Sequence, residues 1–171
     1  MFDILQQKPN DILSIGDLLD ESFGKDRLEK TAYRLRDNIN PVAELCFVLR
    51  DGGQLLASLQ FWPVLIKQAQ GAELEALLLG PIAVQEKLQG QGHGIRLMQH
   101  ALEKARKLGH KRVILVGDEA YYKRVGFSRA LAQGLTMPGP VDQNRLLGHE
   151  LVPGALKNIK GRISRITRSA E

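Results

Sequence analysis

A glycine-rich turn between an apolar strand and an amphipathic helix constrains this chain more than any other feature. Over residues 89–94 it reads Gln-Gly-Gln-Gly-His-Gly. A helix N-terminus presents unpaired backbone N–H groups and a partial positive charge. Glycines let the backbone approach an anion closely and take positive φ. We therefore expect a phosphate to bind at the helix start. The residues expected to hold it are Gly90, Gln91, Gly92, His93, Gly94 and Ile95.

Two well-known phosphate-binding turns do not fit this sequence. The P-loop of nucleoside triphosphatases needs Lys and Ser or Thr after its last glycine, but Gly94 is followed by Ile95 and Arg96. The dinucleotide fingerprint needs a third glycine at position 95 or 97, and these positions hold Ile95 and Leu97. The antiparallel strands expected before the turn also argue against the dinucleotide-binding fold.

Apolar periodicity and turn residues predict the elements around the glycine turn. Strands are expected at residues 2–6, 45–49, 55–66 (with a bend or bulge at Pro63), 73–84, 112–117 and 146–151. Helices are expected at residues 12–23, 26–36, 92–107 and 119–124. The strand–helix–strand order across the turn predicts a parallel pair with a right-handed crossover. The fold class is therefore α/β (α+β-like), with a mixed central sheet, an antiparallel meander before a βαβ unit, and helices on both faces.

Length and charge limit the organisation of the chain. The 171 residues fit one domain, because domains cluster near ~100–150 residues. We assign residues 1–155 to that domain and residues 156–171 to a basic tail, which we expect to be partly disordered. The net charge of +5 suits an anionic ligand. It would also suit weak contact with nucleic acid, although the tail lacks aromatic residues for stacking on bases, so we expect no nucleic-acid partner.

Cysteine and hydropathy patterns point to the cytoplasm. Cys46 is the only cysteine, so no internal disulfide can form. No apolar run reaches the ~18 residues that a membrane span needs, and residues 1–11 lack the pattern of a signal peptide. We expect a cytoplasmic protein without a membrane partner. The histidines have no metal-like spacing, so we expect no metal.

Two motifs together carry a resemblance to a known family. Gln89, Gly92 and Gly94 fill a Gln-x-x-Gly-x-Gly pattern, and Tyr122 opens a Tyr-x-x-x-Gly-Phe pattern that ends at Phe127. With the strand before the turn, they resemble the acetyl-CoA-binding core of the GCN5-related N-acetyltransferases (GNAT), in a bacterial branch of poorly defined substrate. The resemblance covers residues 11–127. It implies the GNAT fold and acetyl-CoA as cosubstrate.

The resemblance also assigns roles to residues. It implies that the backbone of Ile82, Ala83 and Val84 bonds the pantetheine arm, while the turn from Gln89 wraps the pyrophosphate. It implies direct attack of a primary amine on the thioester in a ternary complex, with Tyr122 as the general acid beside the sulfur. A phenol can protonate a leaving thiolate of similar basicity. The alternative is that Tyr122 only packs over the pantetheine.

The general base and the acceptor are not readable from the sequence. Some relatives carry a Glu on the long strand where this chain has Leu78. Asp118 fits a helix N-cap better than a base, which leaves a water chain as an alternative. Arg36 would suit an acidic acceptor group, but we favour a solvated helix end. The amine, the length of the acyl group and the oligomeric state, including a homodimer, stay open. The alternative function is a non-catalytic, regulatory CoA-binding module of the same fold.

Overall fold

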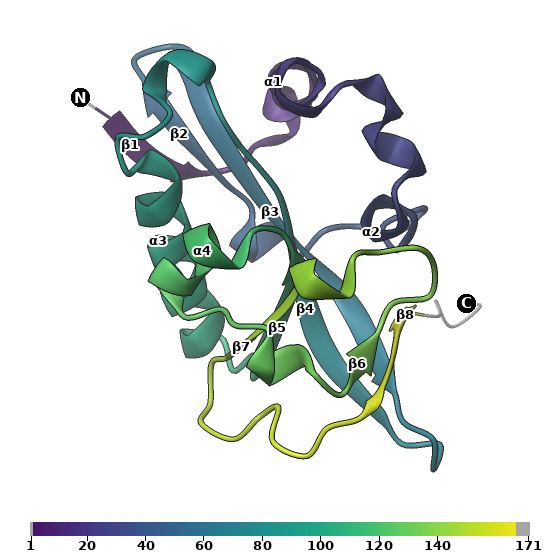
Figure 1. Cartoon of the computed structure of the whole chain (residues 1–171). Helices are drawn as coiled ribbons and strands as arrows, with labels where there is room; N and C mark the ends of the chain where they lie inside the picture. Colours follow the sequence, from purple (N-terminus) through teal and green to yellow (C-terminus); the bar gives the residue numbers. More distant parts are fainter. Residues whose placement is uncertain (1, 167–171) are drawn as a thin grey trace.

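The computed structural model describes residues 2–166 and is built on one mixed β-sheet (Figure 1). The strand order is β1-β2-β3-β4-β5-β7, while β8 pairs with β3 and β6 pairs with β8. Only β4 with β5 and β6 with β8 run parallel. The strands are β1 (Phe2–Gln6), β2 (Phe47–Asp51), β3 (Gln54–Lys67), β4 (Glu73–Val84), β5 (Arg112–Val116), β6 (Leu135–Thr136), β7 (Leu146–Glu150) and β8 (Gly161–Arg165).

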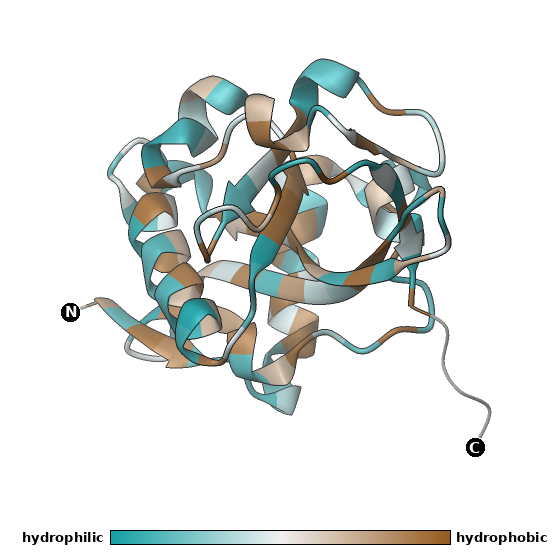
Figure 2. Ribbon diagram, turned by 90° about the horizontal axis from the view of Figure 1, so that it is seen from below, coloured by the Kyte–Doolittle hydropathy of each residue, from teal (hydrophilic) through white to brown (hydrophobic). Residues whose placement is uncertain are grey.

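Helices cover both faces of this sheet, as the sequence predicts. The helices are α1 (Ile12–Phe23), α2 (Thr31–Arg34), α3 (His93–Lys107) and α4 (Glu119–Tyr122). Side chains alternate across β4, so Leu77 and Leu79 join the core under α3, whereas Leu78 joins the core on the opposite face with Leu35. Helix α3 is strongly amphipathic (Figure 2). The residues of its apolar stripe are buried: Ile95, Met98, Ala101, Leu102 and Ala105.

The long strand β3 forms the spine of the sheet. It pairs with β4 along most of its length, with β2 near its start and with β8 near its end. The predicted bend at Pro63 is wrong, because β3 runs without interruption from residue 54 to 67. Pro63 lies in the stretch where neither β2 nor β8 pairs with β3, so its missing N–H leaves no partner unpaired there. The register shift lies instead where Gly80 and Pro81 oppose Gln60.

The two parallel strands β4 and β5 separate soon after they meet. They pair only at Leu77 with Val113 and at Leu78 with Ile114. Beyond Leu78, β4 continues to Val84, and no strand within residues 2–166 pairs with it on that edge. The unpaired edge exposes backbone N–H and C=O groups that are available to a ligand.

Two further predictions need correction. The helix predicted over residues 26–36 is a 3-10 turn, Lys25–Glu29, followed by the single turn of α2. Buried Arg27 explains the break, since it pairs with Asp20 and also donates to the Gly24 carbonyl at 3.2 Å. The tail predicted to be partly disordered contains β8, in which Ile163 is fully buried against β3. Residues 167–171 of the tail, including Arg168, lie outside the described residues.

None of the helices in residues 2–166 combines the length and the apolar character that a membrane span requires.

Candidate functional site

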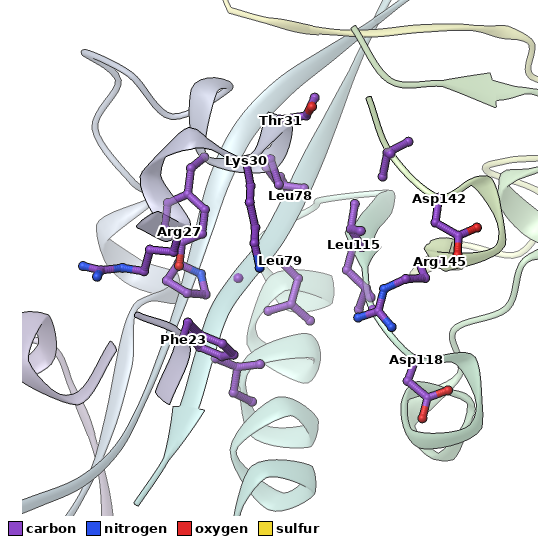
Figure 3. Close-up of a pocket in the computed structure, with 18 of the residues that line it drawn as sticks. Phe23, Arg27, Lys30, Thr31, Leu78, Leu79, Leu115, Asp118, Asp142 and Arg145 are labelled. Carbon is purple, nitrogen blue, oxygen red and sulfur yellow. The ribbon is translucent and has the colours of Figure 1, made fainter. Parts of the chain in front are cut away.

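Two adjoining cavities open where β4 and β5 separate. The larger has a volume of about 790 Å³ and the smaller about 450 Å³. Four residues line both cavities: Phe23, Ile82, Tyr121 and Tyr122. Figure 3 shows the larger cavity, with Leu79 of β4 on one side and Leu115 of β5 across from it. The site is thus one continuous space with a narrow strand-and-turn end and a wider end.

The smaller cavity collects nearly all the residues predicted to hold the cofactor. The predicted residues that line it are Ile82, Ala83, Val84, Gln89, Gly90, Gly92, His93, Gly94 and Ile95. Gln91 is the exception: its side chain donates to the Lys87 carbonyl at 3.3 Å and is exposed. The Gln89 side chain donates to the Val84 carbonyl at 3.2 Å. The motif glutamine therefore ties the glycine turn to the end of β4.

The glycine turn has the conformation and the charge that an anion needs. Gly90 and Gly92 have φ of +78° and +83°, in the left-handed region that favours glycine. Gly92 is the N-cap of α3, whose first turn contains no acidic residue and whose last turn contains three basic ones. The positive end of the helix dipole is therefore not neutralised by a side chain of its own first turn.

His93 contributes to the turn through its backbone, because apolar packing holds its ring. The side chain is buried and meets Phe2 edge to face at a centroid distance of 4.9 Å. Neither ring nitrogen has a hydrogen-bond partner among the described residues.

Tyr122 lies at the junction of the two cavities. Its ring packs against Gly117, where a Cβ atom would clash with it, and meets Phe127 at 6.3 Å and Tyr121 at 4.9 Å between centroids. Burial raises the pKa of the Tyr122 phenol to about 12, while the charge of Arg145 acts in the opposite direction. The phenol is therefore protonated at neutral pH, as a general acid must be.

Tyr121, the neighbour of Tyr122, also faces the site. It lines both cavities, and a Cβ added at Gly94 would lie 2.5 Å from its hydroxyl. The Tyr121 hydroxyl thus reaches the first turn of α3. Burial raises the pKa of Tyr121, and nearby Arg124 acts in the opposite direction. Arg124 also lines the smaller cavity and is a cation that the sequence analysis did not assign to the site.

The carboxylates near the site are engaged elsewhere. Asp118 caps α4 by accepting from the Ala120 N–H at 3.2 Å, and Asp142 accepts from the Asn144 N–H at 2.9 Å. These two are the only acidic residues among the described ones that line the larger cavity. Glu119 accepts from the Arg129 N–H at 2.7 Å. The Leu78 position is buried in the core.

Two arginines of the larger cavity also escaped the sequence analysis as site residues. Arg145 follows the loop that joins β6 to β7, and its backbone carbonyl accepts from the Gly117 N–H at 2.8 Å, which places it beside the end of β5. Arg36 lines the same cavity but is buried. No short motif surrounds either residue, since both reach the site through tertiary packing. Within residues 2–166, no three His, Cys, Asp or Glu side chains gather as a metal site requires.

Known proteins share this architecture and part of this sequence. The family model described as the acetyltransferase (GNAT) family matches residues 12–127. The chain is 31% identical over 153 residues to an uncharacterized N-acetyltransferase, YhbS, of Escherichia coli, covering 90% of this chain and 89% of YhbS.

Solved structures agree with the sequence comparison. The crystal structure of Escherichia coli YhbS in complex with CoA superposes with a TM-score of 0.80 at 30% identity, covering 96% of this chain and 89% of that one. A Brucella melitensis GNAT acetyltransferase in complex with acetyl-CoA has a TM-score of 0.71 at 24% identity, covering 98% and 97% of the two chains, and shows the same fold. Together, the family match and the similarity to YhbS show that this chain belongs to the GNAT family of acetyltransferases.

Proposed function

We propose that the protein transfers the acetyl group of acetyl-CoA to a primary amine by direct attack in a ternary complex. The observation that carries this proposal is the junction of the two cavities. The residues expected to bind the donor line one cavity, a protonated tyrosine stands at the junction, and the second cavity is free for an acceptor. The structures of two GNAT relatives in complex with CoA or acetyl-CoA support the choice of donor.

The donor would lie along the edge of β4. Its pyrophosphate oxygens would accept hydrogen bonds from backbone N–H groups of the turn at Gly90 and Gly92. The α3 dipole favours negative charge at this position. Its pantetheine arm would pair with the backbone groups of residues 82–84 that face away from β3. This places the thioester near Tyr122, with a backbone N–H close to Val84 to polarise its carbonyl.

The chemistry would proceed through a tetrahedral intermediate. The neutral amine nitrogen attacks the thioester carbon, a C–N bond forms, and negative charge develops on the oxygen. The C–S bond then breaks, and the thiolate takes the Tyr122 phenolic proton. The amine proton returns to the phenolate through water, since Asp118 and Asp142 are engaged as caps. Arg145 would stabilise the transient phenolate, because its charge already lowers the cost of ionising Tyr122.

Adjacent tyrosines offer a matched experiment. Thiol release from acetyl-CoA is measured over a panel of amines for wild type, Tyr122→Phe and Tyr121→Phe. We expect Tyr122→Phe to lower kcat by about 100-fold, the scale of one proton transfer, with little change in the Kd of acetyl-CoA. We expect Tyr121→Phe to raise the KM of acetyl-CoA and to preserve kcat, since its hydroxyl reaches the first turn of α3. An unchanged kcat in Tyr122→Phe would remove Tyr122 from the role of acid.

A non-catalytic CoA-binding module is the second candidate. The engaged carboxylates of the larger cavity favour it, because no side-chain base is free among the described residues there. Acetyl-CoA binding without thiol release for any amine would select this candidate. The single, unpaired thiol of Cys46 supports a cytoplasmic location for either function.

A further inference from the structure

The larger cavity contains a buried arginine that the proposed chemistry does not use. Arg36 lines the cavity beside β4, and its Nη2 would lie 3.2 Å from a Cβ added at Gly80. The residue is only 8% exposed. Burial lowers the pKa of its guanidinium to about 10, so the group is still charged at neutral pH.

Arg36 has no anionic partner in the described part of the chain. No ion pair involves it, and its Nε and Nη1 are buried without a hydrogen-bond acceptor. The indole Nε1 of neighbouring Trp62 is buried without a partner as well. Buried donors are rarely left unpaired, and a buried charge without a counter-ion is costly. Arg36 lines the cavity, so its two unpartnered nitrogens indicate that an acceptor group arrives with a ligand.

Aromatic packing holds this guanidinium in place. Its carbon lies 4.4 Å from the centre of the Tyr33 ring and 5.8 Å from that of Trp62. Rings stacked in this way stabilise the charge and fix the plane of the guanidinium. The Tyr33 side chain also forms a hydrogen bond with the guanidinium, which leaves Nε and Nη1 without an acceptor. The planar fork of an arginine matches a carboxylate with two parallel hydrogen bonds.

The charges around the cavity also favour an anionic group on this side. Lys30 and Arg27, which precede Arg36 in the chain, also line the cavity. Figure 3 shows Asp118 and Asp142 on the opposite side of the cavity from Arg27 and Lys30. Arg27 is already paired with Asp20, and Lys30 is exposed. Among the described residues that line the cavity, this leaves Arg36 as the buried cation without a carboxylate partner.

We propose that the amine acceptor is a small molecule that carries a carboxylate, and that Arg36 binds this carboxylate beside Gly80. This inference rests on the proposed acetyltransferase function. The cavity volume of about 790 Å³ lies in the range of small-molecule sites. Its remaining wall is largely apolar, with Leu78, Leu79 and Leu115 buried behind it, which suits an amino acid with an apolar side chain.

Amino acids and their amides give a direct test. The kcat/KM of acetyl transfer is compared for leucine with leucinamide, phenylalanine with its amide, and β-alanine with its amide. An amide has more free amine at neutral pH, so intrinsic reactivity favours the amide. We expect the wild type to prefer at least one acid over its amide by at least about tenfold, the scale of a charged hydrogen-bond pair. Phosphoethanolamine is included as an amine that carries a phosphate in place of the carboxylate.

Two arginines on the same segment provide a matched pair of variants. Arg36→Gln should reduce the acid-to-amide ratio to one or below, and Arg36→Lys should retain part of it. Arg34→Gln should keep the wild-type ratio, because Arg34 is exposed and does not line the cavity. The wild-type comparison does not depend on whether the Arg36→Gln protein folds.

A binding measurement separates this inference from the proposed function. The thermal unfolding of the CoA-saturated protein is followed with N-acetylleucine and with N-acetylleucinamide. Stabilisation by N-acetylleucine but not by its amide supports the carboxylate site. If, in addition, no amine leads to thiol release, only the acetyltransferase proposal is overturned. Equal kcat/KM for acids and amides overturns the inference and leaves acetyl transfer intact. A preference for phosphoethanolamine over every amino acid also overturns it. If no amine leads to thiol release and N-acetylleucine and N-acetylleucinamide stabilise the protein equally, both the acetyltransferase function and the carboxylate site are overturned.

Discussion

The Tyr122 phenol illustrates how burial sets the chemistry of a single residue. Its ring lies against Gly117 and Phe127 at the end of β5, and this apolar contact raises its pKa to about 12. A neutral phenol is favoured in such surroundings because burial penalises the phenolate. Arg145 opposes this effect from the larger cavity. The phenol is therefore protonated at neutral pH, as the proposed general acid has to be.

A pH profile tests the shifted pKa of Tyr122. The pKa of about 12 in the folded protein exceeds the ordinary phenol value of about 10. Stability from this group is therefore fully present below about pH 10 and is lost as the pH rises toward about 12. We expect the free energy of unfolding, measured by urea denaturation, to fall less for Tyr122→Phe than for the wild type between about pH 10 and about pH 12. We also expect no alkaline fall in kcat below about pH 10. A fall centred well below that pH would contradict the role of Tyr122 as a buried acid.

Individual residues differ in how far the sequence predicts their place. Gly92 and Tyr122 belong to motifs with fixed spacing, so their neighbourhood was predictable. Arg36 was expected at a solvated helix end, and its burial arises from Tyr33 and from Trp62 on β3. Such a contact depends on the path of the whole chain, and the local pattern does not record it.

At the scale of elements, the strand–turn–helix unit was predictable because it is locally consistent. β4 has the predicted bounds, and α3 begins within the predicted turn. The one-turn α2 was predicted as part of a longer helix, because the pairing of Arg27 with Asp20 is tertiary. β8 was missed because this strand has only five residues, lies in a basic segment and has only one buried residue, Ile163.

An alanine substitution in β8 tests whether this part of the tail belongs to the domain. Ile163 is fully buried beside Ile66 of β3. We expect Ile163→Ala to lower the free energy of unfolding by about 2–5 kcal/mol through lost burial and a residual cavity. Ser164→Ala, at the next position of the strand, should change it by less than about 0.5 kcal/mol. Chemical denaturation measures both, and equal stability of Ile163→Ala and wild type would show that β8 is dispensable.

At the scale of the whole molecule, the separation of β4 and β5 organises the site. The sheet opens beyond Leu78, α3 directs its N-terminus at one end of the opening, and the segment between α1 and α2 closes the other. Figure 1 shows α3 on one side of the sheet and α1 and α2 toward the other. In the proposed function, donor and acceptor would therefore occupy separate cavities that meet at Tyr122. Such an arrangement favours direct transfer over an acetylated enzyme.

Bisubstrate kinetics test direct transfer. We expect intersecting initial-velocity lines, and no acetylated protein by mass spectrometry after incubation with acetyl-CoA alone. Cys46 is unsuited as a nucleophile, because it is buried in the core and burial raises the pKa of its thiol to about 11. Cys46→Ala should therefore keep the wild-type kcat. Parallel lines, or loss of turnover in Cys46→Ala, would indicate an acetyl-enzyme intermediate instead.

The central claim is that the glycine turn and the open edge of β4 bind acetyl-CoA. Titration calorimetry of acetyl-CoA into the wild type, Gly92→Glu and Gly71→Glu tests it most directly. Gly92 and Gly71 have similar φ, +83° and +89°, with nothing within 4 Å of an added Cβ, but Gly71 lies in the β3–β4 hairpin away from the cavities. We predict saturable binding to the wild type and Gly71→Glu, and none to Gly92→Glu, whose carboxylate would occupy the anion site. Absence of binding to the folded wild type, or equal binding to Gly92→Glu, would contradict the claim.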